Sequence, residues 1–82
     1  MFEVRIEKNA RNFIKKLDNS SQKEILKKIR KLKENPFMGK ALTGNLSGLW
    51  RIRIGKYRVV YQIKNSELIV IVLDVGHRKN IY

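Results

Sequence analysis

Apolar and polar side chains alternate near the start of the chain, in Phe-Glu-Val-Arg-Ile-Glu at residues 2–7. A period of two predicts a half-buried β-strand with Phe2, Val4 and Ile6 facing inward. The period then lengthens, and apolar side chains recur with the i, i+3, i+4, i+7 spacing of an amphipathic helix, at Ala10, Phe13, Ile14 and Leu17. We therefore expect a strand followed by a short helix.

A second amphipathic helix is predicted after an interruption at residues 18–20. Ser-Gln-Lys-Glu at residues 21–24 has the pattern of a capping box, with Ser21 at the N-cap and Glu24 at N3. The apolar stripe of this helix consists of Ile25, Leu26, Ile29 and Leu32. Pro36 ends it, because the residue before a proline avoids the α conformation. The two helices are expected to form a helical hairpin.

Residues 37–48 carry three glycines and no regular period. A stretch of this kind is typical of a loop. We expect an ordered connection, with three of its apolar side chains packed against the core: Phe37, Leu42 and Leu46.

Residues 50–63, Trp-Arg-Ile-Arg-Ile-Gly-Lys-Tyr-Arg-Val-Val-Tyr-Gln-Ile, contain two alternating runs around Gly55-Lys56. This pattern predicts a β-hairpin with a two-residue turn of type II′, in which the glycine supplies a positive φ. Counting outward from the turn places Arg53 opposite Arg58, with Arg51 on the same face. The other face carries the large apolar side chains, Trp50, Ile52, Ile54, Tyr57, Val59 and Tyr61.

The three arginines of this hairpin predict an anionic partner. Like charges directly opposite each other destabilise a strand pair, so Arg53 facing Arg58 needs a reason beyond folding. A phosphate is the simplest such reason, because guanidinium groups bind phosphate in a bidentate manner. A solvated polar face is the alternative interpretation.

The last predicted strand is a nearly continuous apolar run at residues 68–75, typical of a central strand covered on both faces. No repeat or interdomain linker interrupts the chain. The order of strand, two helices and three antiparallel strands predicts a single α+β domain over residues 1–82. In it, the N-terminal strand and a three-stranded antiparallel meander form one sheet that packs on the helices.

The charge of the chain narrows its possible partners. Nineteen lysines and arginines against seven acidic residues give a net charge of +12, which favours RNA, DNA, an acidic protein or an anionic membrane surface. The absence of cysteine excludes a disulfide framework and a thiolate nucleophile. No apolar run approaches the length of a membrane span, and the first residues lack the apolar segment of a signal peptide. We expect a cytoplasmic protein.

The sequence contains few of the residue patterns that mark common catalytic sites. It has one histidine and scattered acidic residues, so we expect no metal site and no serine triad. It has no phosphate-binding glycine loop, and no cofactor is expected. The residues that remain for catalysis are arginines, lysines, tyrosines and His77. They suit the cleavage of RNA, which carries its own nucleophile in the 2′-hydroxyl group.

In such a reaction a protein orients the 2′-hydroxyl, stabilises the charged transition state and moves two protons. The electrostatic role is assigned to four arginines, Arg51, Arg53, Arg58 and Arg78. Tyr82 could act as the base near these cations, and His77 could exchange protons near neutral pH. Taken alone, Tyr82 could equally be a surface residue at a chain end, and His77 a turn residue.

Three segments carry a resemblance to a known family: Leu-Trp-Arg-Ile-Arg-Ile at 49–54, Tyr-Arg-Val-Val-Tyr at 57–61, and Val-Leu-Asp-Val-Gly-His-Arg-Lys-Asn-Ile-Tyr at 72–82. Together they resemble the RelE/ParE superfamily of toxin–antitoxin toxins, most closely the RelE mRNA interferases. The resemblance spans the whole chain. It implies a compact sheet packed on two helices and a ribosome-dependent endoribonuclease. Such an enzyme cuts mRNA in the A site without a metal and leaves a 2′,3′-cyclic phosphate and a 5′-hydroxyl.

The same resemblance implies roles for individual residues. Arg58 and Arg78 match the arginines that bind or protonate the reacting phosphate, and Tyr82 matches the tyrosine that orients or deprotonates the 2′-hydroxyl. Arg51 and Arg53 stand where the best-known members carry two lysines. Arginine does not give up its proton in proteins, so the base role passes to Tyr82 or to the neighbouring histidine, His77. Lys56 in the turn completes the predicted RNA-binding set.

The family also implies partners: an acidic RelB-like antitoxin, and the ribosome with its mRNA. The complex of toxin and antitoxin is expected to bind operator DNA. Two other functions remain open at this stage. One is inhibition of DNA gyrase by a ParE-like toxin, and the other is a basic RNA-binding domain without catalysis.

Overall fold

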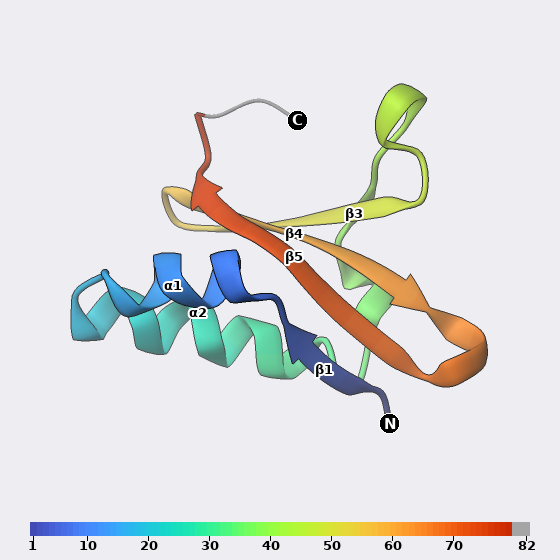
Figure 1. The fold of residues 1–82 in the computed structure, drawn as a ribbon, viewed down its shortest axis with the longest axis horizontal. Helices are drawn as coiled ribbons and strands as arrows, with labels where there is room; N and C mark the ends of the chain where they lie inside the picture. Colours follow the sequence, from blue (N-terminus) through green and yellow to red (C-terminus); the bar gives the residue numbers. More distant parts are fainter. Residues whose placement is uncertain (80–82) are drawn as a thin grey trace.

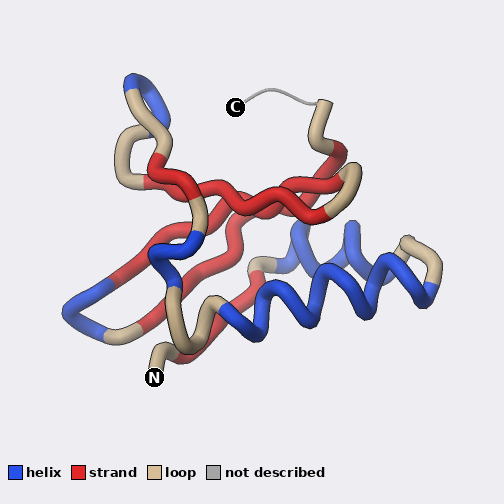
Figure 2. Tube along the Cα trace, turned by 180° about the vertical axis from the view of Figure 1, so that it is seen from behind, coloured by secondary structure: helices blue, strands red, loops and turns tan. Residues whose placement is uncertain are grey.

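The computed structural model describes residues 1–79. Two helices and five strands follow one another in these residues, with the bounds β1 Glu3–Ile6, α1 Lys8–Lys15, α2 Asn19–Lys31, β2 Lys40–Ala41, β3 Leu49–Ile54, β4 Tyr57–Lys64 and β5 Ile69–His77. Short 3-10 turns precede β2, β3 and β5. The strands form one sheet in the order β1-β5-β4-β3-β2. Both helices pack on the same face of it (Figures 1 and 2).

The predicted α+β architecture is confirmed, with two additions. Strand β1 lies parallel to β5 and pairs Val4 with Val70. The chain between β1 and β5 contains both helices and the other three strands, and two parallel strands need a long connection of this kind. The second addition is β2, a two-residue strand inside the segment that the sequence predicted as a loop.

The hairpin of β3 and β4 has the predicted register. Ile54 pairs with Tyr57, and Arg53 pairs with Arg58. Gly55 has a φ of +57°, the positive value that the turn needs and that glycine adopts without steric cost. The turn therefore fixes which side chains of the hairpin share a face.

Helix α2 begins earlier than the sequence pattern indicated. Asp18 is the N-cap, and its carboxylate accepts a hydrogen bond from the Ser21 backbone N–H at 3.2 Å. Ser21, the predicted N-cap, thus lies within the first turn. An aspartate can both cap a helix and complement the positive end of its dipole, so it displaces the later serine. The Gln22 amide donates to the Leu17 carbonyl at 2.8 Å and closes the corner between the helices.

The core fills the space between the helices and the sheet. Its buried members include Ala10, Ile14, Ile25, Ile29 and Leu32 from the helical hairpin, and Tyr57, Val59, Tyr61, Val70, Val72 and Val75 from the sheet. The expectation for Phe37 is wrong, because its side chain is 50% exposed. Its ring instead borders Phe2 and Trp50 at the surface, with centroid distances of 6.4 and 5.6 Å. Leu42 and Leu46 are half-buried.

Strand β5 is central, as its apolar run predicted, but the helices cover one of its faces and not both. On the uncovered face Ile71 and Leu73 stay half-buried. A β-bulge shifts the pairing of β4 and β5, so that Val60 lies opposite Asp74 while Tyr61 lies opposite Val72. Leu73 is the extra residue. Bulges redirect the side chains that follow them, and this one precedes the residues of the candidate site.

Candidate functional site

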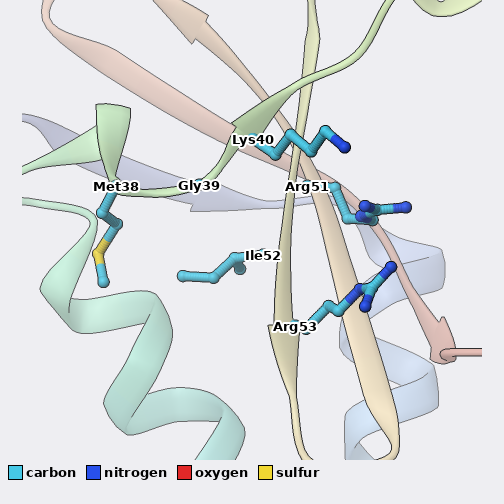
Figure 3. Close-up of a pocket in the computed structure, with 6 residues that line it drawn as sticks. All are labelled: Met38, Gly39, Lys40, Arg51, Ile52 and Arg53. Atoms are coloured by element: carbon cyan, nitrogen blue, oxygen red, sulfur yellow. The ribbon is translucent and has the colours of Figure 1, made fainter.

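The face of the sheet that points away from the helices carries a group of basic side chains, which we call the arginine face: Lys40, Arg51, Arg53 and Arg58. Three of them, Lys40, Arg51 and Arg53, point to the same side in Figure 3, while Met38 and Ile52 point to the other. These side chains border a hollow of about 390 Å³. Arg53 is exposed and Arg51 is half-exposed. The structure therefore brings together the cations that the sequence placed on one face.

Lys40 belongs to this face, and sequence reasoning missed it. It lies directly opposite Arg51 in the pairing of β2 with β3. The approach of the two strands depends on Gly39, because a Cβ atom there would clash with the Tyr61 hydroxyl and lie 2.6 Å from the Arg51 carbonyl oxygen. A two-residue strand has no recognisable period, so the preceding glycine was the one signal available.

Arg58 differs from the other arginines because it is buried, with 4% of its surface exposed. Its Nη2 donates to Asp74 Oδ2 at 3.1 Å, and its Nη1 donates to the His77 carbonyl at 3.2 Å. Gly76 lies directly against the guanidinium group, where a Cβ atom would clash with Nη1. The pairing of Arg53 with Arg58 predicted an anion from outside the chain, but the carboxylate of Asp74 already pairs with Arg58. An external phosphate is therefore expected to contact the exposed members of the arginine face.

The ring of His77 is on the opposite side of the sheet from the arginine face. It packs against Phe13 and Tyr57, with centroid distances of 5.9 and 5.4 Å. Side chains alternate along a strand, so His77 points to the helix side while Gly76 faces Arg58. The structure brings the backbone of His77, but not its imidazole, to the guanidinium group of Arg58.

Arg78 fastens the end of β5 to the hairpin turn. Its backbone N–H donates to the Lys56 carbonyl at 2.7 Å, and its Nη1 donates to the Gly55 carbonyl at 3.2 Å. Lys56 extends over the Tyr57 ring, 5.6 Å from its centroid. Lys56 and Arg78 therefore form a second basic group at the tip of the hairpin. Tyr82, one of the two residues predicted as the base, lies outside the described residues.

Comparison with known proteins identifies the family to which this chain belongs. Residues 4–82 match the family described as the ParE toxin of the type II toxin–antitoxin system parDE. The chain belongs to the RelE/ParE toxin superfamily. A putative toxin RelE1 of Methanocaldococcus jannaschii is 34% identical over 86 residues, covering 99% of this chain and 94% of the relative. A putative RelE-like toxin protein of Escherichia coli is 29% identical over 80 residues, covering 95% and 84%.

Solved structures agree with this assignment. The RelBE2 toxin–antitoxin complex of Mycobacterium tuberculosis contains a chain that matches the toxin with a TM-score of 0.86 and 30% identity, covering 94% of this chain and 98% of that one. The isolated RelE toxin of Escherichia coli has the same fold, with a TM-score of 0.82 at 21% identity and coverage of 99% and 88%. The protein is thus a RelE-like toxin of a type II toxin–antitoxin system.

The aromatic side chains on the helix side of the sheet serve the toxin as packing residues. Tyr61 is fully buried and its hydroxyl donates to the Pro36 carbonyl at 2.7 Å. Burial raises the pKa of Tyr61 above its ordinary value, because the phenolate would lose its hydration. The indole ring of Trp50 stacks on Tyr61 with a centroid distance of 6.4 Å. These residues hold the hairpin in place beneath the arginine face.

Within residues 1–79 of the toxin, no three histidine or acidic side chains converge as they would around a metal ion. The same residues contain no helix that is long and apolar enough to cross a membrane. The site of the toxin contains four positively charged side chains, of which three are exposed or half-exposed to solvent and one, Arg58, is held against a carboxylate.

Proposed function

We propose that the toxin is an endoribonuclease that cleaves mRNA in the ribosomal A site. The observation that carries the proposal is the convergence of Lys40, Arg51 and Arg53 on one side of the sheet (Figure 3). The buried Arg58 pairs with Arg53 on the neighbouring strand. A surface of this kind suits a substrate whose charge increases during reaction. In RNA cleavage that substrate is a phosphodiester, which becomes a doubly charged phosphorane when the 2′-hydroxyl attacks.

In the proposed reaction the 2′-oxygen bonds to phosphorus, and the bond from phosphorus to the 5′-oxygen breaks. The products are a 2′,3′-cyclic phosphate and a 5′-hydroxyl. Arg51 and Arg53 hold the non-bridging oxygens, and Arg58 stabilises the charge that develops on them. Positive charges gathered in this way can supply the stabilisation that a metal ion supplies in other nucleases, so the proposed reaction needs no metal.

Two protons move in this reaction, one from the 2′-hydroxyl and one to the leaving 5′-oxygen. The position of the His77 ring on the helix side of the sheet favours Tyr82 over His77 as the base in our proposal. Lys40 is a further candidate for contact with the substrate, because it places an amine beside Arg51 on the arginine face. Arg78 and Lys56 at the hairpin tip are proposed to bind flanking phosphates.

The proposal includes an acidic antitoxin as partner. Three of the similar solved structures are complexes of a RelE toxin with a RelB antitoxin. The net charge of +12 suits an acidic protein, because complementary charge speeds association. We further propose that the complex binds operator DNA, and that the toxin acts in the cytoplasm, where its ribosomal target lies.

The test is incubation of the purified toxin with ribosomes stalled on a defined mRNA, followed by analysis of the cleaved ends. We expect cleavage that depends on the ribosome, persists in a chelator, and yields 2′,3′-cyclic phosphate and 5′-hydroxyl ends. Intact mRNA, or cleavage of free RNA at the same rate, would contradict the proposal. Binding that weakens with salt, without cleavage, would indicate a non-catalytic RNA-binding domain.

Inhibition of DNA gyrase is the second candidate function, because the matching family is described as the ParE toxin. In the proposal the arginine face favours the nuclease, since a gyrase inhibitor that acts by protein contact has no need of a phosphate site. A DNA supercoiling assay separates the two. Gyrase arrested by the toxin, with ribosome-bound mRNA left intact, would favour the ParE-like activity.

A further inference from the structure

A second basic hollow lies between helix α2 and the free edge of strand β3. We call it the lysine groove. It has a volume of about 280 Å³ and is lined by Glu24, Lys27, Lys28 and Lys31 from α2, and by Arg53 and Gly55 from the hairpin. Four cations and one carboxylate therefore face a space that is large enough for part of a charged ligand.

The amphipathic pattern of α2 explains why lysines reach this groove. Ile25 and Ile29 turn the apolar stripe of the helix into the core, so the polar side of the helix stays outside it, and Lys27, Lys28 and Lys31 border the hollow beside the sheet edge. Lys27 and Lys31 are four residues apart and stand one above the other, separated by about 6 Å along the helix axis. Lys28 is half-buried, as expected when an aliphatic stem packs along a wall of the groove.

These cations have no ion-pair partner among the described residues. The ion pairs found in residues 1–79 join Arg5 to Glu3 and Arg58 to Asp74. The groove carboxylate, Glu24, is directed at the turn, with its Oε1 lying 3.3 Å from the position of a Cβ on Gly55. Like charges four positions apart destabilise a helix, so the pair of Lys27 and Lys31 carries a cost that a bound anion would reduce. Glu24 lies four positions before Lys28 and offsets the charge of that lysine.

The lysine groove is continuous with the arginine face through Arg53, which borders both hollows. Strand β2 pairs only with Trp50 and Arg51. Within the described chain, the rest of β3 up to Ile54 therefore has no neighbouring strand on this side. Among the described residues, no strand therefore covers the edge of the sheet at Arg53, where the two hollows meet.

We propose that the lysine groove binds the phosphate backbone of RNA next to the segment held on the arginine face, so that the strand passes over the edge of β3. This inference rests on the proposed function for the identity of the polyanion. An acidic protein segment would also match the charge. RNA is favoured because its evenly spaced charges can occupy both hollows in succession, with Arg53 as the shared contact.

The test measures binding of a single-stranded oligoribonucleotide, methylated at its 2′-hydroxyls to prevent cleavage, over a series of salt concentrations. The variant is Lys27→Ala/Lys31→Ala. The matched control is Lys8→Ala/Lys15→Ala, which removes the same charge from exposed positions on α1. Each phosphate contact on a single strand contributes about 0.7 to the slope of log K against log salt. We expect the groove variant to lose about 1.4 from this slope, and the control to keep the wild-type slope.

An equal loss of slope in the two double variants would overturn the inference, because it would show a diffuse charge effect. An unchanged slope in the groove variant would overturn it as well. If affinity for an acidic antitoxin then fell in that variant alone, the groove would be a protein site and not an RNA site.

Cleavage of ribosome-bound mRNA by the wild-type toxin, measured in parallel, tests the proposed function separately. A toxin that fails to cleave but shows the expected change of slope would retain the groove as an RNA-binding surface.

Discussion

Asp74 on β5 holds the buried guanidinium group of Arg58 on β4, with Nη2 and Oδ2 3.1 Å apart. The pair forms across two neighbouring strands, one position from the β-bulge. A second hydrogen bond, to the His77 carbonyl, fixes the orientation of the guanidinium plane. Arg58 is therefore held in place before any substrate arrives, which is the condition under which a charged side chain contributes most to catalysis.

Asp74→Asn should lower the cleavage rate while leaving the fold intact. The amide retains an oxygen that can accept a hydrogen bond but loses the charge, so the guanidinium group is held less firmly. Misplacement of a catalytic group by about 1 Å can cost about 100-fold in rate, and we expect kcat to fall by about 10- to 100-fold with KM little changed. Single-turnover cleavage of ribosome-bound mRNA measures this effect.

Glu67→Gln is the matched control for Asp74→Asn, because Glu67 is an exposed acidic residue in the turn before β5. It should cleave at the wild-type rate. A higher rate in Asp74→Asn would mean that Asp74 restrains Arg58 from reaching the phosphate, and would reverse the role that we assign to it.

Lys40→Ala should reduce kcat/KM by about 100-fold, the magnitude typical of removing one preorganised donor from a site of developing charge. Lys40→Arg keeps the charge opposite Arg51 and should retain most of the activity. The same cleavage assay compares the two variants. If both lose activity equally, the amine of Lys40 carries a proton in addition to its charge. Wild-type activity in Lys40→Ala would exclude it from the site.

His77→Ala should affect the stability of the toxin, whereas Tyr82→Phe should affect its cleavage rate. The His77 ring packs on Phe13 and Tyr57, and aromatic pairs contribute about 0.5–1.5 kcal/mol each, so its removal should lower the free energy of unfolding with kcat retained. Tyr82→Phe removes only a hydroxyl and should lower kcat by about 100-fold or more, as expected for the loss of a general base. Urea unfolding and single-turnover cleavage separate the two effects. Retained cleavage in Tyr82→Phe together with lost cleavage in His77→Ala would reverse this assignment.

Asp18 should make the stability of the toxin depend on pH in the acidic range. The hydrogen bond from Ser21 lowers the pKa of Asp18 below its ordinary value of 3.8. The unfolded chain therefore binds this proton more readily, and the stabilisation is complete above pH 3.8 and is lost as the pH falls through the lower pKa of the folded state. Denaturant unfolding of wild type and Asp18→Ala between about pH 5 and pH 2 measures it. The difference in stability should shrink as the pH falls, and a constant difference would contradict the assignment of the cap.

The hairpin was predictable in detail because three local signals agreed. Alternation in β3 and β4, the glycine in the turn and the two-residue loop together allow one register, and a shift by a single residue would bury the arginines. The pairing of Arg53 with Arg58 follows from them. The start of α2 was predicted three residues too late. Asp18 and Ser21 can both cap a helix and lie within one turn, and the sequence does not show which of them has the backbone conformation of an N-cap.

The remaining features depend on contacts between distant segments. Asp74 lies in an apolar run, and the bulge at Leu73 decides that its carboxylate meets Arg58. Lys40 joins the arginine face through a strand that is too short to show a period. Arg58 illustrates this limit, because the sequence predicted an anionic partner from outside the chain, whereas the carboxylate that pairs with Arg58 belongs to Asp74.

The place of β5 in the sheet has a consequence for synthesis of the toxin. Among the strands that the structure describes, β5 is made after the other four, yet it lies between β1 and β4. A nascent chain that has not reached residues 69–77 cannot pair its first strand or hold Arg58 against Asp74. Completion of the sheet therefore waits for residues 69–77, as expected when contacts are distant in sequence. A ribosome that is making the toxin must therefore synthesise residues 69–77 before a complete arginine face exists.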